Sequence, residues 1–269
     1  MHDKRHEQEF WDHEYAEGGG IRARFYGEIN AIAWEDIFRK TQPLRGRRVA
    51  FVGCGTAAGP VRDLRRLGAD VVALDISTEA VRQVREFPRY DGEGTMIPLV
   101  GDAEYLPLAD ASVDTVLGKA IVHHLDLDRF GAEVARVLRP GGRFVFWEPL
   151  GTNPVINLFR RFTPQIRVPT EHPFTPAHLR QFGRCFDEFH CEYHLCTSLM
   201  TIPLFWWGLR QTPTWLLRRL DGLDLRWGRL FEPIRRLAWV VAIYGGRSSG
   251  SLAPAPGSAG AELSAGARC

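Results

Sequence analysis

Short apolar runs alternate with amphipathic segments through the middle of the chain. Residues 48–53 (RVAFVG) and 70–75 (DVVALD) are almost continuously apolar, which predicts two strands buried on both faces. Three further strands are expected at 97–100, 113–117 and 143–148, with helices at 60–67, 77–86 and 127–138. Because strands and helices alternate, the pattern predicts an α/β fold whose parallel sheet is covered by helices on both faces.

The N-terminal segment has a helical pattern without strands. Residues 5–17 and 28–40 predict two helices, and the three glycines at 18–20 between them predict a hinge. We therefore expect residues 1–45 to form a helical segment that precedes the sheet.

After residue 150 the alternation stops. Residues 151–176 contain five prolines and little periodicity, so a long structured loop is expected there. Thr175 is expected to cap a helix that ends near Phe182. The strict alternation over 186–195 then predicts a strand.

The C-terminal part combines helices, one strand and a tail. Residues 199–236 predict helices rich in tryptophan and arginine, and 237–245 (LAWVVAIYG) predict a last strand. Residues 246–269 are rich in Pro, Gly and Ser, and we expect this tail to be disordered.

The turn after the first strand carries the pattern Gly53-x-Gly55-x-x-Ala58. The glycines let backbone approach a ligand, and the next helix offers N–H groups to an anion. Asp75 ends the second strand, where its carboxylate can accept both hydroxyls of a ribose. The pattern fits the dinucleotide fingerprint. It also resembles motif I of the class I S-adenosylmethionine-dependent methyltransferases, in which the anion is the methionine carboxylate.

The segment that follows favours the second interpretation. It resembles the small-molecule methyltransferases of that class over about residues 47–150. The motifs that carry the resemblance are Asp102-Ala103, Leu106-Pro107, Asp114, His124-Leu125 and the run RVLRPGG at 136–142. No Tyr-x-x-x-Lys motif of the short-chain dehydrogenases occurs in the chain.

The resemblance implies a Rossmann-like, doubly wound sheet of seven strands. It implies a methyltransferase domain at 46–245, with an N-terminal helical lid and a helical insertion before the last strand. Two segments, 151–174 and 197–236, are additional to the family core and are expected on the acceptor side.

The resemblance also implies S-adenosylmethionine as the cofactor. The glycine loop would line its methionine end, Asp75 would bind the ribose, and Ile76 and Asp102 would contact the adenine. Trp11 and Tyr26 are expected contacts from the N-terminal helices. The full set of expected cofactor-binding residues is Gly53, Cys54, Gly55, Thr56, Asp75, Ile76, Asp102, Ala103, Lys119 and Tyr26.

Two positions depart from the family pattern. Phe51 stands where the family has an acidic residue, and Ala57 stands at its third glycine. The acidic residue helps to hold the methionine end of the cofactor. These departures leave an alternative open, a cofactor-binding protein that does not methylate, either a regulator or a cyclase-like helper.

Methyl transfer needs a base only when the acceptor is a hydroxyl, an amine or a carbon acid. The candidates are His123, His124, Glu148 and His172, and each also has a structural interpretation as a cap or scaffold. The cysteines and histidines at 185–196 fit no common zinc spacing, so no metal is expected.

The acceptor is expected to be a hydrophobic or amphiphilic small molecule, such as a biosynthetic intermediate. The expected acceptor-binding residues are Arg160, Arg161, Arg167, Trp206 and Trp207. Five of the eight tryptophans lie within residues 200–239, which suits a substrate lid, a peripheral membrane contact, a homodimer face or simple packing on the core.

Composition excludes other classes. The formal net charge is only +2, and no basic stripe or recognition domain indicates nucleic acid. The apolar runs are too short for a membrane span, and the first residues lack the apolar region of a secretory signal. Five cysteines, an odd number, favour the reducing cytoplasm over a disulfide scaffold.

Overall fold

A seven-stranded sheet forms the centre of the computed structural model, which describes residues 4–17, 20–56, 58–86, 92–162, 171–196 and 214–249. The strands are β1 (Arg48–Val52), β2 (Asp70–Asp75), β3 (Met96–Val100), β4 (Val113–Lys119), β5 (Leu138–Pro149), β6 (Glu188–His194) and β7 (Val240–Gly246). Their order is β3-β2-β1-β4-β5-β7-β6, and β7 is antiparallel to both of its neighbours. The doubly wound, Rossmann-like sheet expected from the sequence is confirmed.

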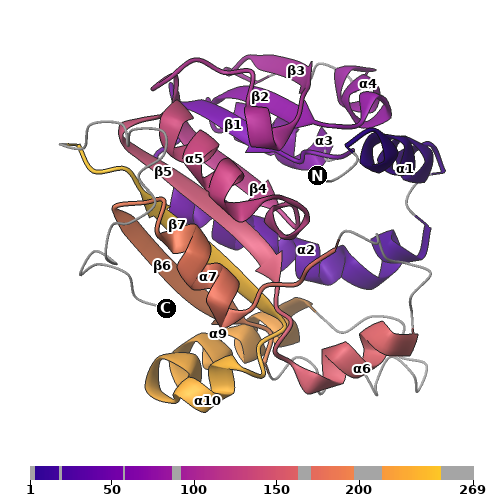
Figure 1. Ribbon diagram of the computed structural model, residues 1–269, viewed down its shortest axis with the longest axis vertical. Coiled ribbons are helices and arrows are strands. Elements are labelled where there is room, and N and C mark those ends of the chain that lie inside the picture. Colours follow the sequence, from indigo (N-terminus) through magenta and orange to yellow (C-terminus); the bar gives the residue numbers. More distant parts are fainter. Residues whose placement is uncertain are drawn as a thin grey trace.

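The central strands β1, β2 and β4 are mostly buried because helices cover both faces of the sheet, whereas the edge strand β3 is partly exposed (Figure 1). The long helices are α1 (Lys4–Ala16), α2 (Gly20–Thr41), α3 (Ala58–Arg66), α4 (Thr78–Glu86), α5 (Leu127–Val137), α6 (Pro154–Phe162), α7 (Pro176–Gly183) and α9 (Thr214–Leu230). The short ones are η1 (Ala103–Tyr105), η2 (Val122–His124) and α10 (Glu232–Arg235).

Two hydrophobic clusters lie on opposite faces of the sheet. One contains Phe130 of α5 and Phe182 of α7, and the other contains Ile37 of α2 and Leu64 of α3. Residues that alternate along β1 divide between the clusters, as the period of a strand requires. The parallel strands thereby bring their carboxyl ends to one edge of the molecule.

The expectation of a long loop over 151–176 is wrong for residues 154–162, which form α6. Pro154 occupies the first helical position, where the missing N–H costs nothing. Asn153 caps the helix, because its side-chain oxygen accepts from the backbone N–H groups of Val155 and Ile156 at 2.9 and 3.1 Å.

Two other boundaries also differ from the expected ones. Helix α2 begins at Gly20 rather than near residue 28, and β5 begins at Leu138, before the Gly141-Gly142 turn. The expected hinge residues Gly18 and Gly19 lie outside the described residues.

Arg167, Trp206, Trp207, Ala57 and the tail from residue 250 also lie outside the described residues, and so does the side chain of Tyr26 within α2. Among the described helices, none combines the length and the apolar character needed to cross a membrane.

Candidate active site

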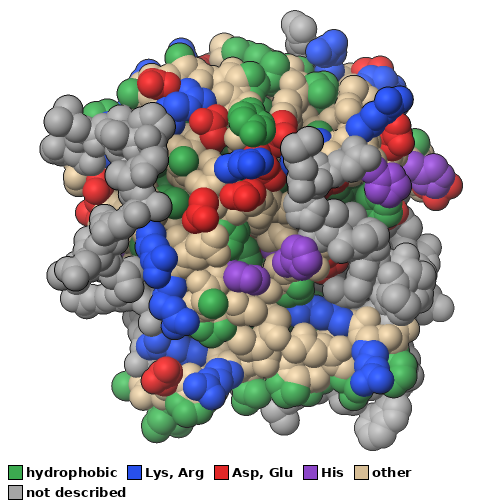
Figure 2. Space-filling view, in the orientation of Figure 1, with side chains coloured by type: hydrophobic (Ala, Val, Ile, Leu, Met, Phe, Trp, Pro, Cys, Tyr) green, Lys and Arg blue, Asp and Glu red, His purple; other side chains and the backbone are tan. Residues whose placement is uncertain are grey.

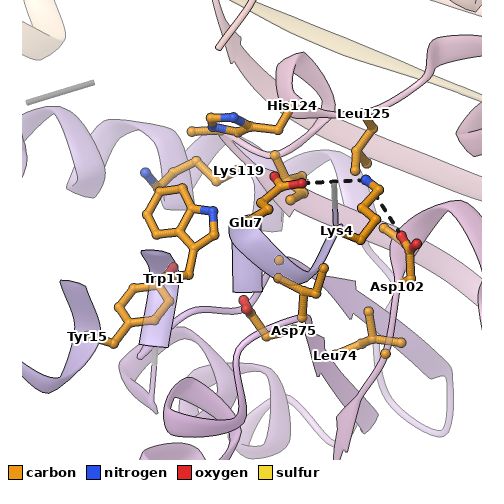
Figure 3. Close-up of a pocket in the computed structure, with 16 residues that line it drawn as sticks. Lys4, Glu7, Trp11, Tyr15, Leu74, Asp75, Asp102, Lys119, His124 and Leu125 are labelled. Carbon is orange, nitrogen blue, oxygen red and sulfur yellow. Dashed lines mark ion pairs between the residues drawn. The ribbon is translucent and has the colours of Figure 1, made fainter. Parts of the chain in front are cut away.

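A cleft that is partly open to solvent lies at the carboxyl edge of β1, β2 and β4. Its floor is the backbone that follows these strands, and α1 covers it (Figure 3). The expected residues that line it are Gly53, Asp75, Ile76, Asp102, Ala103, Lys119 and His124. The structure therefore brings together residues that are up to 71 positions apart in the chain, from Gly53 to His124.

The glycine loop leaves no room for side chains. Gly53 has a φ of +64°, and a Cβ there would lie 2.7 Å from Cγ1 of Ile121. Gly55 has a φ of +50°, and its Cβ would lie 3.0 Å from the Tyr15 hydroxyl. Both positions therefore need glycine for conformation and for space. Of the neighbouring residues, Cys54 is buried and Thr56 is exposed.

Asp75 is a buried carboxylate at the end of β2. Its Oδ2 accepts from the N–H of Gly55 at 2.7 Å, and its Oδ1 accepts from the N–H of Ser77 at 2.9 Å. Burial raises the pKa of Asp75 to about 6, although these two amides oppose the shift. One side chain thus connects the glycine loop to the start of α4.

The opposite end of the cleft is built around η1. Asp102 caps this short helix by accepting from the N–H of Glu104 at 2.9 Å. Lys4 of α1 approaches both acids, at 2.7 Å from Glu104 and 3.9 Å from Asp102. The helix η1 and the residue before it are therefore held against α1.

Lys119 ends β4 and lines the cleft. Burial lowers the pKa of its ammonium, and the negative charge of Glu148 opposes that shift. Among the described residues, no hydrogen bond or ion pair engages this ammonium. It is therefore available to a negatively charged group of a ligand.

Glu148 of β5 and His123 of η2 form a buried pair. Glu148 is fully buried, and its Oε1 accepts from the N–H groups of Ile121 and Val122, both at 3.0 Å. Its Oε2 lies 2.7 Å from Nδ1 of His123. Burial raises the pKa of Glu148 to about 7. This carboxylate holds the turn that carries His123 and His124.

The two remaining histidine candidates differ in position. His124 lines the cleft, and its ring meets the edge of Trp11 with the ring centres 5.7 Å apart. His172 is exposed, and its backbone N–H donates to the carbonyl of His123 at 3.0 Å. Of the four candidate bases, only His124 therefore contributes to the lining of the cleft.

Helix α1 supplies residues that sequence reasoning missed. Asp12 accepts from the Ser77 hydroxyl, the Thr78 hydroxyl and the Glu79 N–H, so it fastens α1 to the start of α4. Glu7 is buried and lies in the cleft beside Lys4 (Figure 3). From this helix, the sequence predicted only an aromatic contact, Trp11.

The expected acceptor-side arginines that are described lie on α6. Arg160 donates to the carbonyl of Leu150 at 2.7 Å and to the side chain of Asn157, whereas Arg161 is exposed. Neither lines the cleft described above. Their assignment to acceptor binding stays a prediction.

Phe51, which replaces the family's acidic residue, belongs to the core. It is 1% exposed and meets Trp34 of α2 edge to face, with ring centres 5.2 Å apart. An aromatic pair therefore fills the position beneath the glycine loop.

A second group of polar side chains lies outside the cleft. Asp36, Glu192 and His194 approach one another closely enough to hold a metal ion. The Lys40 ammonium already occupies the space between the two acids, at 2.5 Å from Asp36 and 2.6 Å from Glu192. His194 also binds Asp221 of α9 at 3.0 Å. This network joins α2, β6 and α9. The ammonium of Lys40 takes the position that a metal ion would need.

Residues 51–146 match a family model described as a methyltransferase domain. An uncharacterized methyltransferase of Mycobacterium tuberculosis is 43% identical over 102 residues, which cover 38% of this chain and 39% of the relative. A malonyl-[acyl-carrier protein] O-methyltransferase of Methylococcus capsulatus is 46% identical over 80 residues, 29% of this chain and 28% of the relative. These curated relatives are therefore matched over about two fifths of their length or less.

Solved structures match over more of the chain but at low identity. A Haloferax volcanii protein, solved in complex with the Trm112 methyltransferase activator, has a TM-score of 0.61 at 19% identity and covers 91% of this chain and 99% of that one. Phosphoethanolamine N-methyltransferase 2 of Haemonchus contortus, solved with S-adenosyl-L-methionine, has a TM-score of 0.58 at 19% identity and covers 81% and 52%. These likenesses concern the fold.

The sheet order, the reversed β7 and the glycine-lined cleft define the class I methyltransferase fold. Residues 51–146, about a third of the chain, match the methyltransferase family model, so this fold contains a methyltransferase domain.

Proposed function

We propose that this protein transfers the methyl group of S-adenosylmethionine to a hydrophobic or amphiphilic small molecule, an intermediate of a biosynthetic route. The observation that carries the proposal is the cleft that joins a buried carboxylate, a glycine loop and a histidine. The matched relatives, one of which acts on malonyl-[acyl-carrier protein], support a small acceptor rather than a nucleic acid.

The residues of the cleft fit the cofactor. Because Gly53 has no side chain and lines the cleft, the methionine end would lie directly against the backbone of the loop. Asp75 would accept the ribose hydroxyls with the lone pairs that the two amides leave available. Ile76 would pack on the adenine, and Asp102 with the N–H of Ala103 would bind its edge.

When bound, the cofactor supplies a methyl group on a sulfonium, which is already activated for attack. The protein then has to orient the acceptor and exclude water. Trp11 and Tyr15 of α1, stacked with ring centres 5.5 Å apart, cover the cleft and would serve the second task. Residues 1–45 would act as the lid.

His124 is the best placed group to remove a proton from the acceptor, because its side chain belongs to the cleft. Glu148 would position it, since that carboxylate is occupied by the backbone of η2 and by His123. Lys119 would bind an anionic group, either the methionine carboxylate or a charged part of the acceptor. Segments 151–174 and 197–236 would form the acceptor side.

The test combines binding with turnover. Calorimetry with S-adenosylhomocysteine should show binding, and a panel of phenols, fatty acids and acyl carriers should reveal an acceptor through methyl-labelled product. His124→Asn should then lower kcat at least about tenfold with little change in cofactor affinity. Asp70→Asn, at the other end of β2, is the matched control and should behave as wild type.

Two results would contradict the proposal. Absence of cofactor binding at millimolar concentration would remove its basis. Tight binding without methylation of any acceptor would favour the alternative, a cofactor-binding regulator or cyclase-like helper. The side chain of Phe51 lies in the core, so its contacts do not support that alternative. A cytoplasmic location stays a prediction from the cysteine count.

A further inference from the structure

The outward face of α9 is apolar. Leu223, Trp227 and Leu230 follow one another at helical spacing, with 48%, 48% and 69% of their surfaces exposed, and Trp215, 61% exposed, lies about two turns earlier. Trp227 also stacks on the exposed Phe231, with ring centres 5.5 Å apart. Exposed apolar side chains in a continuous row indicate a binding surface rather than scattered exposure.

The polar side of α9 faces inward. Asp221 is buried and binds Nδ1 of His194 at 3.0 Å and the N–H of Leu195 at 3.1 Å. Asp224 is buried as well, with 1% of its surface exposed. These contacts with β6 fix the rotation of the helix about its axis. The apolar row is therefore held outward by the fold.

A second apolar row lies on α6. Val155, Leu158 and Phe162 are 54%, 57% and 73% exposed. The side chain of Asn153, which caps α6, donates to the carbonyl of Leu237 just after α10, so the two segments meet. Figure 1 shows α6, α9 and α10 at the same end of the molecule, and hydrophobic and basic side chains gather along that end in Figure 2.

The charges on this end are mainly positive. Arg161, Arg219, Arg226 and Arg236 are exposed, and no ion pair between described residues engages them. The exposed acid on α9 and α10, within their described part, is Glu232. Arginine beside tryptophan and leucine on one helix face suits a layer that is apolar inside and negatively charged at its surface.

We propose that the end of the molecule formed by α6, α9 and α10 binds the surface of an anionic lipid bilayer. Tryptophan and leucine would enter the headgroup boundary, and the arginines would bind lipid phosphates. A second copy of the chain fits this face less well, because a symmetric dimer would bring the same arginines opposite one another. The proposal is independent of the methyl-transfer reaction.

The test is sedimentation of the full chain with lipid vesicles. Vesicles of phosphatidylcholine mixed with phosphatidylglycerol should bind the protein, with a blue shift of tryptophan emission. Vesicles of phosphatidylcholine alone should bind it much more weakly. Binding to the anionic vesicles should weaken as the salt concentration rises, because exposed charges are screened.

Variants separate the apolar and basic contributions. Trp227→Glu with Leu230→Glu should abolish binding. Arg219→Gln and Arg226→Gln should each weaken it about fivefold, the effect of about 1 kcal/mol per arginine near an anionic surface. Ile97→Glu on β3, 56% exposed and at the opposite end of the molecule, should bind as wild type does.

Three results would overturn the proposal. The first is that the protein binds neither kind of vesicle, and the second is that it binds both kinds equally. The third is a dimer in light scattering that Trp227→Glu converts to a monomer. The last would assign the face to a second copy. Affinity for S-adenosylhomocysteine and the melting temperature, measured for every variant, show that lost binding does not come from unfolding.

Discussion

At the scale of single residues, Asp75 is a buried carboxylate whose two oxygens are both hydrogen-bonded. It is 5% exposed and holds two backbone N–H groups, one from the glycine loop and one from the start of α4. Burying a carboxylate is costly unless it is paired. Two amides supply part of that pairing, and in the proposed function the ribose hydroxyls of the cofactor would supply the rest.

Asp75→Asn should weaken binding of S-adenosylhomocysteine about 10- to 100-fold, since hydrogen bonds to a charged group contribute about 1.5–3 kcal/mol. Calorimetry measures the loss. Asp70→Asn changes the same residue type in the same strand, where the side chain binds Thr95 instead, and should leave affinity unchanged. Equal losses in both variants would mean that the effect comes from the strand and not from the cleft.

The raised pKa of Asp75 predicts the pH dependence of binding. The ionised carboxylate accepts ribose hydroxyls better than the protonated form, so affinity should fall about tenfold per pH unit below pH 6 and be level above it. Calorimetry between pH 5 and pH 8 (about one unit below and two above this pKa) tests this. Asp75→Asn should remove the dependence, and a slope that persists in the variant would assign it to another group.

Stability should change with pH in the opposite direction. The pKa of Asp75 is about 6 in the folded protein and 3.8 ordinarily. A raised folded value means that this group stabilises the fold fully below its ordinary pKa and that this contribution is lost as pH rises through 6. The loss of affinity in acid therefore does not follow from unfolding through this residue.

The sequence alone could predict the cleft residues that lie at the carboxyl ends of strands. Asp75 ends a strand of the parallel sheet, and Gly53 and Asp102 follow two others, so the local pattern alone brings these positions to one edge. Asp12 could not be predicted, because its role depends on packing against Ser77, 65 positions away. No periodicity in a polar helix shows which carboxylate will meet another helix.

At the scale of elements, α1 connects the cleft to the start of α4. Ser77 accepts from the Ala80 N–H and Asp12 from the Glu79 N–H, so two N–H groups of the first turn of α4 are capped from two different segments. The same helix carries Trp11 and Tyr15 over the cleft. The contact of Asp12 with α4 thus contributes both to the attachment of α1 and to the closure of the cleft.

Asp12→Ala should release α1 from α4. The expected cost is about 0.5–2 kcal/mol of unfolding free energy, the range for losing a helix cap. S-adenosylhomocysteine should also dissociate faster, because the aromatic cover opens more often. Urea unfolding and stopped-flow fluorescence measure the two effects. Glu9→Ala, on the exposed side of the same helix and paired with Arg5, should change neither. A stability loss without faster dissociation would separate the contact from closure of the cleft.

Among elements, the strands were predicted closely and α6 was missed. The predicted range 70–75 matches β2 because a short apolar run between turns is typical of a buried strand. In 151–176 the number of prolines suggested a loop, yet Pro154 and Pro176 both stand at helix starts. Asn153 and Thr175 before them are the caps, so the position of each proline matters more than the number.

At the scale of the whole molecule, the cleft lies where several parts of the fold meet. Its lining comes from α1 and from the ends of β1, β2 and β4. The sheet joins these strands to both hydrophobic clusters. A ligand that contacts all of them binds only the folded chain, so binding must stabilise the entire fold.

S-adenosylhomocysteine at about 100 times its dissociation constant should add about 2.7 kcal/mol of unfolding free energy. For a chain of this size, that corresponds to a rise in melting temperature of about 5–10 °C. Calorimetric or fluorescence melting measures it. NAD⁺ at the same concentration is the control, because the glycine loop alone also fits a dinucleotide, and it should cause no shift. An equal rise with NAD⁺ would contradict the cofactor assignment, and a rise that survives Asp75→Asn unchanged would mean that the ligand binds outside the cleft.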